Sequence, residues 1–309
     1  MLRTRAMAVA ALATTALTLS ACGSDTLDTG SGSTSSGAAS ASPSAIPTPT
    51  VDPALAAKVP ASVKSAGKMV VGTDATYAPN EFLGADGKTV EGMDVDLFNA
   101  VAAKLGVTNQ WQPADFGSII LGVTGGKFDA GVSSFTVNAE RMKQVNMVQY
   151  FNAGTQWVVA KGNPKTVDPD NACGLNIGVQ KNTVQVDDLT ARSKACTDAG
   201  KPAINAIVEQ DQSKVTTNVV SGKADAMLAD SPVGLYAVTQ TDGKLEALGD
   251  IYDAAPYGIV VPKDEAEFAS AVSEAFTALE KDGIYTAILE KWGNAAGAVT
   301  EFTVNPSVG

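Results

Sequence analysis

The chain has 309 residues, of which 45% are hydrophobic and 18% charged, and its formal net charge is −11. This length suits two domains or lobes rather than one. An acidic surface argues against nucleic acid and anionic lipid headgroups as partners. The chain contains no histidine, which excludes Ser-His-Asp and Cys-His nucleophiles and every histidine-containing zinc site. We therefore expect no nucleic-acid partner, no metal and no cofactor, although a Lys, Tyr or carboxylate base remains available for catalysis.

The first 21 residues have the pattern of an export signal. Arg3 and Arg5 form a basic region, and residues 6–19 form an apolar run too short for comfortable membrane spanning. The following Leu19-Ser20-Ala21-Cys22-Gly23 resembles the bacterial lipobox, which implies removal of residues 1–21 and lipidation of Cys22. The alternative is a plain secretory signal with an incidental cysteine. Lipid on Cys22 would hold the protein at the extracellular face of the cytoplasmic membrane without a spanning helix.

Residues 22–59 are expected to form a flexible tether behind that cysteine. Ser, Gly, Ala, Thr and Pro dominate up to about Pro53, so this stretch cannot bury enough apolar surface to order itself. Alanines and lysines in residues 54–68 favour a helix that leads into the folded part. The two remaining cysteines, Cys173 and Cys196, are expected to pair because the domain is exported.

The rest of the chain alternates predicted strands and helices. Two consecutive blocks of this alternation indicate an α/β fold with two lobes. We expect strands at 68–72, 109–113, 128–132, 155–159, 175–179, 203–208, 224–232 and 257–261. We expect helices at 94–105 with Asp94 as cap and Gly106 as stop, at 115–123, from Asn138, from 180–183, and at 214–220, 268–279 and 284–292.

Hydroxyl side chains follow the predicted strand at 128–132. Ser133, Ser134 and Thr136 are expected in a loop, and Asn138 is expected to cap the next helix. A strand end beside a helix start offers free backbone N–H groups to a small anion, and Arg141 adds a forked cation that suits a carboxylate. Taken alone, the stretch fits ordinary loop serines and a solvated arginine slightly better.

Acidic residues follow the first predicted strand and begin the first long helix. Asp74 and Tyr77 lie in a loop at a strand end, a common site position in α/β folds. A proline turn with Tyr77 packed in the core explains this loop equally well. Asp94 and Asp96 are interpreted as a helix cap and a first-turn charge rather than as metal ligands.

Together these motifs resemble the family 3 solute-binding proteins of ABC importers, a class that captures polar amino acids. The resemblance covers about residues 66–295. Its most specific part is Gly92-Met93-Asp94-Val95-Asp96-Leu97, which matches the family pattern Gly-Phe-Asp-hydrophobic-Asp-hydrophobic with methionine in place of phenylalanine. Residues 72–79, 133–141 and 226–230 follow in the order and spacing of the family.

The resemblance implies a periplasmic-binding-protein-like fold, with two α/β lobes joined by two crossover strands and the ligand between them. Lobe one would comprise residues 60–159 and 258–296, and lobe two residues 160–257. Residues 297–309 would form a C-terminal tail.

The resemblance also assigns roles to eight residues, each carried over from a matching position. Arg141, helped by Thr136 and the backbone of Thr183, would hold the ligand's α-carboxylate. Asp230 and the backbone around Ser134 would hold its α-ammonium. The ligand side chain would pack on Tyr77 and Phe116, with Asp74 nearby.

Two positions depart from the family pattern. Asn80 follows Tyr77-Ala78-Pro79 where many members continue with an aromatic residue, so the side-chain pocket is expected to differ. Asn182 replaces the glycine that usually precedes Thr183.

The expected function is that of a monomeric, lipid-anchored receptor, not an enzyme, that delivers an amino acid to the transmembrane subunits of an ABC permease. Glutamate or glutamine is the favoured ligand. Lys181 would supply the second cation for an acidic ligand, whereas Asp74 would suit a basic one. The alternative is a prephenate-type dehydratase on the same fold, for which Asp74 and Lys181 are the acid–base candidates.

Overall fold

The computed structural model describes residues 46–308. The export signal and Cys22 therefore lie outside the described residues. The elements follow in the order α1 (Pro53–Ala57), α2 (Ala61–Ala66), β1 (Lys68–Thr73), β2 (Thr76–Tyr77), β3 (Glu81–Leu83), β4 (Val90–Glu91), α3 (Met93–Lys104), β5 (Thr108–Pro113), α4 (Phe116–Thr124), β6 (Ala130–Thr136), α5 (Ala139–Gln144), β7 (Val145–Ala160), β8 (Asn176–Gln180), α6 (Val184–Asp198), β9 (Asn205–Glu209), α7 (Gln212–Val220), β10 (Ala226–Asp230), α8 (Ser231–Gln240), β11 (Leu245–Pro262), α9 (Ala266–Lys281), α10 (Ile284–Lys291) and a 3-10 turn (Ala295–Gly297).

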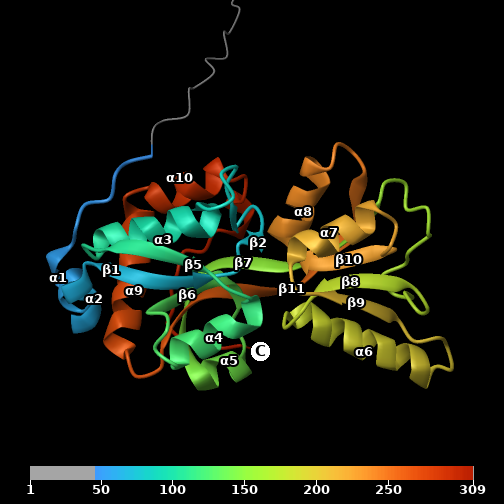
Figure 1. Ribbon diagram of the computed structural model, residues 1–309, viewed down its shortest axis with the longest axis horizontal. Coiled ribbons are helices and arrows are strands. Elements are labelled where there is room, and N and C mark those ends of the chain that lie inside the picture. The colour runs from blue at the N-terminus through green and yellow to red at the C-terminus, as the bar shows by residue number, and fades with distance from the viewer. Residues whose placement is uncertain (1–45, 309) are drawn as a thin grey trace, which may run out of the picture. The chain divides into compact units, whose positions relative to one another are not determined.

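An eight-stranded sheet runs through this part of the chain in the order β5-β1-β6-β11-β7-β10-β8-β9 (Figure 1). β7 and β11 pair antiparallel from Val145 opposite Pro262 to Ala160 opposite Leu245. Their other edges bind different strands, because β6 pairs with β11 whereas β10 pairs with β7. β7 and β11 thus cross from a first half, containing β5, β1 and β6, to a second half, containing β10, β8 and β9. The short strands β2, β3 and β4 form a separate sheet.

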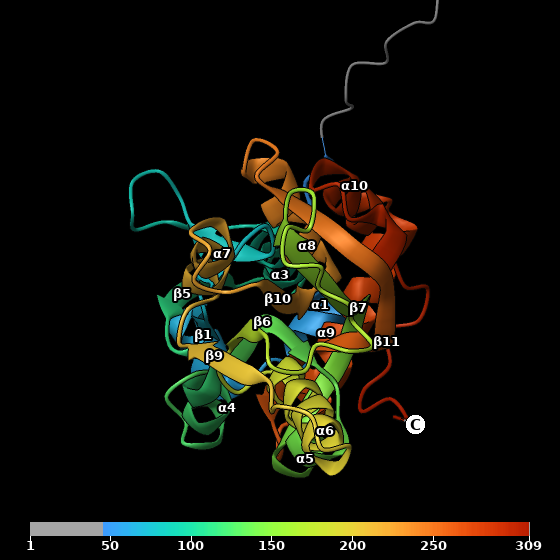
Figure 2. The same ribbon diagram turned by 90° about the vertical axis from the view of Figure 1, so that its right-hand side faces the viewer.

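Helices cover both faces of each half of the sheet (Figures 1 and 2). On β1, Met69 and Val71 pack in the cluster that includes α3, α9 and α10, whereas Val70 packs against the cluster of α4. On β7, Trp157 packs in the cluster of α6, and Val158 packs in the cluster of α7 and α8. Successive strand residues point to opposite faces, so these apolar strands need a helical layer on each side.

Segments at both ends of the described chain pack into the first half. Asp52 caps α1 through two bonds from backbone N–H groups, and Leu55 and Val59 are at most 5% exposed. Residues 52–59, which were expected to belong to the tether, are therefore part of the folded structure, because their apolar side chains belong to the core. In the expected C-terminal tail, Phe302 is buried and Val304 pairs with Val148 of β7.

Three local expectations differ from the structure. Ser133, Ser134 and Thr136 lie in β6 rather than in a loop, because pairing with β11 extends the strand. The strand expected at 224–232 ends at Asp230, and α8 begins at once with a proline in its first turn, a signal that was available in the sequence. Gly92, not Asp94, occupies the cap position of α3, and the Asp94 side chain is fully buried.

Cys173 and Cys196 form the predicted disulfide, which joins the loop before β8 to the last turns of α6. Within residues 46–308, no helix is long and apolar enough to cross a membrane.

Candidate functional site

A pocket lies where the two halves of the sheet meet. Its lining comes from the carboxyl ends of β1, β6, β8 and β10 and from the first turns of the helices α4, α5 and α6, the usual ligand position in α/β sheets. The structure brings together all eight residues named from the sequence. The lining comprises these eight, Asp74, Tyr77, Phe116, Ser134, Thr136, Arg141, Thr183 and Asp230, together with Ser133, Gln180, Val184 and Gln185.

Arg141 is positioned by the start of α5 and by two backbone carbonyl groups. Its backbone N–H donates to the side chain of the cap residue Asn138 at 2.9 Å. Its guanidinium donates to the carbonyl oxygens of Thr136 at 2.7 Å and Asn182 at 3.3 Å, and its central carbon lies 5.3 Å from the ring centre of Phe116. Burial lowers the pKa of Arg141 to about 10, so it stays charged at neutral pH. Because a guanidinium has five N–H donors, donors remain for a carboxylate.

Asp230 contributes a negative charge to the pocket lining, opposite in sign to the charge of Arg141. Its Oδ2 accepts hydrogen bonds from the hydroxyls of Tyr77 at 2.9 Å and Tyr257 at 2.7 Å, and its Oδ1 accepts one from Gln185 at 2.7 Å. Burial raises the pKa of Asp230, and these three donors oppose the rise. Burial also holds the pKa of Tyr77 well above its ordinary value, so this hydroxyl keeps its proton. The donors therefore stabilise a buried carboxylate that faces the pocket.

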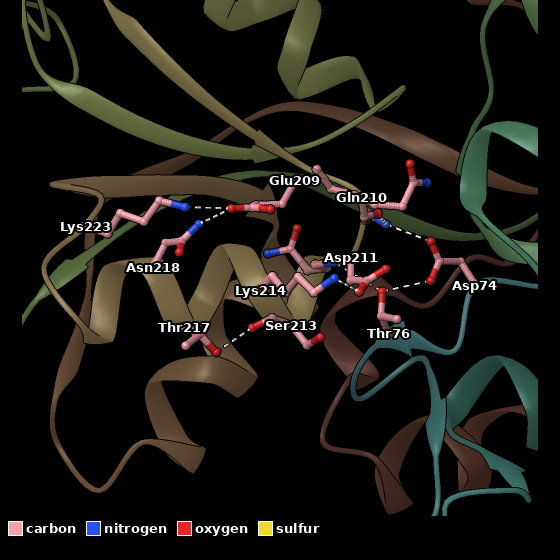
Figure 3. A network of polar contacts seen from close by, with 12 residues as sticks. Asp74, Thr76, Glu209, Gln210, Asp211, Ser213, Lys214, Thr217, Asn218 and Lys223 are labelled. Atoms are coloured by element: carbon pink, nitrogen blue, oxygen red, sulfur yellow. Dashed lines mark hydrogen bonds and ion pairs between the residues drawn. The ribbon is translucent and has the colours of Figure 1, made fainter.

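Asp74 is a second buried carboxylate in the pocket, held from both halves. Its Oδ1 accepts from Thr76 at 2.8 Å, and its Oδ2 accepts from the backbone of Phe116 at 3.2 Å and from Gln180 at 2.7 Å. Burial is the main cause that raises the pKa of Asp74, and the charge of Asp211 adds to it. Figure 3 shows Asp74 and Thr76 beside Asp211 at the start of α7. Since a carboxylate offers about four acceptor positions, Asp74 has room for one more donor.

Direct hydrogen bonds between the two halves enclose the pocket. Gln180 of β8 reaches Asp74, and Tyr77 of β2 reaches Asp230. The backbone N–H of Gln212 at the start of α7 also donates to Thr76 Oγ1 at 3.1 Å. These bonds hold the two halves together over the pocket, and electrostatic contacts in a buried site of this kind are stronger than in bulk water.

The sequence did not single out Gln180, Gln185 and Tyr257. Each is a polar side chain in a regular element, and its role depends on a distant carboxylate that no local motif reveals. The neighbouring Lys181, expected as a second cation, is exposed and does not line the pocket. Asn182 takes a left-handed backbone conformation with φ 66°, which asparagine tolerates better than most residues, so it can stand where glycine is usual.

Comparison with known proteins gives a consistent result. Residues 69–295 match the model of the bacterial extracellular solute-binding proteins, family 3. The arginine-binding protein ArgT of Corynebacterium glutamicum is 35% identical over 261 residues, which cover 84% of each chain. An ancestral arginine-binding protein bound to arginine is 34% identical with a TM-score of 0.67, covering 73% of this chain and 98% of that one. An ancestral arginine-binding protein bound to glutamine is 32% identical, also with a TM-score of 0.67, covering 74% and 98%.

These matches confirm the fold class and the family that the sequence motifs predicted. The matched segment contains every residue that lines the pocket. The chain belongs to the bacterial extracellular solute-binding proteins of family 3.

Proposed function

We propose that this protein captures a basic amino acid, with L-arginine as the first candidate, and delivers it to the permease of an ABC importer. The observation that carries this proposal is the charge of the pocket lining. It contains one guanidinium, Arg141, and two carboxylates, Asp74 and Asp230. Two relatives support the same class of ligand, because the ArgT protein is named as an arginine-binding protein and the ancestral protein was solved with arginine bound.

Each charged group of an arginine ligand has a partner in this lining. The α-carboxylate pairs with Arg141, assisted by Thr136 and the backbone of Thr183. The α-ammonium pairs with Asp230 and with the backbone around Ser134. Asp74 is then left for a cationic side chain, which would pack on Tyr77 and Phe116.

This assignment replaces glutamate and glutamine as the favoured ligands. A glutamate side chain would bring a second anion towards Asp74, and no second cation lines the pocket among residues 46–308. A buried anion without a partner costs several kcal/mol, on the order of the penalties measured for broken buried ion pairs. A neutral glutamine side chain avoids that penalty but leaves Asp74 without a cation, so it should bind more weakly than arginine.

The dehydratase alternative has less support from the pocket. Of its two acid–base candidates, Lys181 is exposed outside the lining, and Asp74 is held by three donors. Proton transfer needs an acid or base within reach of the substrate. The pocket therefore supports binding better than turnover.

We further propose that the two halves act as lobe one, residues 60–159 and 258–296, and lobe two, residues 160–257. β11 has register irregularities between Leu248 and Ala255, where it passes between the halves, and such irregular segments suit a hinge.

The lipobox supports a lipid anchor on Cys22 at the extracellular face of the membrane.

The test is the ligand preference of Asp74→Asn. Calorimetric titration of the wild type should give the order arginine above glutamine above glutamate. Asp74→Asn should weaken arginine by roughly 10- to 100-fold, the size expected for a lost hydrogen bond to a charged group, while glutamine binding stays within about threefold.

Asp211→Asn is the matched control, because Asp211 lies beside Asp74, is paired with Lys214 at 2.8 Å and does not line the pocket. It should change arginine affinity by no more than about threefold. Equal losses of arginine and glutamine in Asp74→Asn would contradict the basic ligand.

A further inference from the structure

Two carboxyl groups lie completely buried beside the pocket and take no part in the charge pairing proposed above. Glu81 on β3 and Asp94 on α3 are both 0% exposed. Their hydrogen-bond donors within residues 46–308 are hydroxyl and backbone N–H groups, and none is a lysine or arginine. The titratable groups that face the pair are Asp74, Tyr77 and Tyr150. Two unpaired anions at such a position would each cost several kcal/mol, in the range of burial penalties for single ions.

Glu81 is connected to the pocket through Ser133. The Ser133 hydroxyl donates to Glu81 Oε1 at 3.2 Å and accepts from the backbone N–H of Asp74 at 3.0 Å. The orientation of the Ser133 hydroxyl is therefore set by a donor on one side and an acceptor on the other. Ser133 itself lines the pocket.

Asp94 is connected to the pocket through Ser134, whose backbone has the unusual value φ 50°. A left-handed conformation costs a non-glycine residue about 1–2 kcal/mol, so its surroundings must hold it. The backbone N–H of Ser134 donates to Asp94 Oδ2 at 3.1 Å, and its hydroxyl lies 3.1 Å from the same oxygen and 3.3 Å from Glu81 Oε2. Asn80 donates to that hydroxyl at 2.9 Å, a bond that an aromatic residue at this position could not make.

Two buried oxygens of this cluster, Asp94 Oδ1 and Asn80 Oδ1, lack a donor among the described residues. Asp94 Oδ2 accepts three hydrogen bonds, including one from Tyr150 at 2.5 Å. Asp94 Oδ1 is buried and has no partner among the described residues. The carboxyl groups of Glu81 and Asp94 meet at the Ser134 hydroxyl, whose single proton can serve only one of them. A proton on Glu81 supplies a donor to the Asp94 carboxyl. Burial, and then the charge of Asp94, hold the pKa of Glu81 well above its ordinary value, in agreement with that placement.

We propose that Glu81 and Asp94 share one proton and act as positioning residues, which fix Ser133 and Ser134 for the α-ammonium group of the ligand. The part that concerns the ligand rests on the proposed function above. The shared proton leaves the pair with a single negative charge behind Ser133 and Ser134. Together with Asp230, this charge favours an ammonium at this end of the pocket and a carboxylate at the Arg141 end.

The test uses amide variants that keep or remove the shared charge. In Glu81→Gln, the new amide N–H donates to Asp94 as the protonated acid would. In Asp94→Asn, the new amide N–H donates to an ionised Glu81. Each single variant therefore keeps one anion and one donor. Both should bind L-arginine within about threefold of the wild type. The double variant has no anion and should lose about tenfold or more, the equivalent of one weakened charged contact.

Infrared spectra test the proton without any ligand. At pH 7 the unliganded wild type should show the carbonyl band of a protonated carboxylic acid that disappears in Glu81→Gln and in Asp94→Asn. The matched control is Glu91→Gln, the same substitution at an exposed position on the adjacent strand, and it should keep the band. Thermal unfolding of each variant shows that it is folded before it is compared.

The outcomes separate the two proposals. A wild type that lacks the band, or a Glu81→Gln variant that loses as much affinity as the double variant, overturns the shared proton. A wild type that shows the band but binds no L-arginine and no L-glutamine overturns the proposed function and the ligand half of this inference, and leaves the proton pair established.

Discussion

At the scale of single residues, the groups that contact the Arg141 guanidinium are neutral in the part of the chain that the structure describes. Two carbonyl oxygens and the faces of Phe116 and Phe135 surround its guanidinium. Carbonyl dipoles orient the group without neutralising its charge. That charge is therefore available to a ligand carboxylate, and the nearby Asp230 contributes at longer range.

Removal of this guanidinium should abolish tight binding. In the proposed complex, Arg141→Ala would leave the α-carboxylate of the ligand without a partner, and truncation of one member of such a buried pair costs about 2–5 kcal/mol. Calorimetric titration with L-arginine should show a loss of roughly 30-fold or more. Arg192→Ala removes a partly buried guanidinium that lies over Trp157 and Tyr252, away from the pocket, and should bind L-arginine normally. A near-normal affinity in Arg141→Ala would exclude it from the site.

At the scale of elements, α6 buries few of its side chains although it carries part of the pocket. Of its 15 residues, only Gln185, Leu189 and Cys196 are buried. Its first turn supplies Val184 and Gln185 to the lining. The disulfide at its last turns therefore replaces part of the apolar packing that other helices have.

Loss of this disulfide should lower stability. The cysteines are separated by 23 residues, and closure of a loop of this size contributes about 3 kcal/mol in the chain-entropy model. Urea unfolding of the double variant Cys173→Ser and Cys196→Ser should show a decrease of that order. Reduced wild type is the control and should unfold at the same midpoint as the variant. An unchanged midpoint in both would show that the bridge contributes little.

The first two helices also contribute to stability, although the sequence placed the first of them in the tether. Leu55 of α1 is 5% exposed within the main core cluster. Leu55→Ala should lower the free energy of unfolding by about 2–5 kcal/mol, at the lower end because the site lies near the edge of the core. Val51→Ala, at a position 55% exposed, should change it by less than about 0.5 kcal/mol. Similar urea midpoints for the two variants would contradict the packing of α1.

At the scale of the whole molecule, four buried acids make stability and binding respond to pH in opposite directions. Burial raises the pKa of Asp74, Glu81, Asp94 and Asp230. The folded state then binds more protons than the unfolded state at pH values between the ordinary and the raised pKa. The contribution of these four acids to folding stability is therefore greatest below their ordinary pKa and falls as pH rises through the raised values.

The unliganded protein should accordingly become more stable as pH falls from 7 to about 5, while its affinity for L-arginine decreases because Asp74 and Asp230 must be ionised to bind a cation. Below about pH 4 the trend in stability should reverse, since Asp86 and Glu209 have lowered pKa values and lose their favourable contacts on protonation. Thermal unfolding with and without L-arginine at several pH values measures both effects. Parallel changes of stability and affinity between pH 7 and 5 would refute this account.

The sequence alone predicted much of this protein. The α/β fold class and the disulfide were predicted from local patterns and cysteine usage, whereas the family and eight residues of the pocket lining were predicted from motifs that resemble the family 3 solute-binding proteins. The reason is that strand ends, helix starts and the spacing of short motifs are encoded within a few residues. Residues as distant as Asp74 and Asp230 could be assigned to one site because matching positions were carried over from the family. The order of the parallel strands explains why these strand ends meet at one edge of the sheet.

Only the tertiary structure decided which polar groups are buried together. Gln180 reaches Asp74 across 106 residues of sequence, and Asp94, expected as a helix cap, contacts Ser134 together with Glu81. Lys181, beside the site in sequence, does not line the pocket, so among the described residues the lining lacks the second cation that a glutamate side chain would need. Local sequence sets the backbone conformation and the apolar period of each element. The charge state and partners of a side chain depend on the distant segments that cover it, and these are fixed only when the two halves pack together.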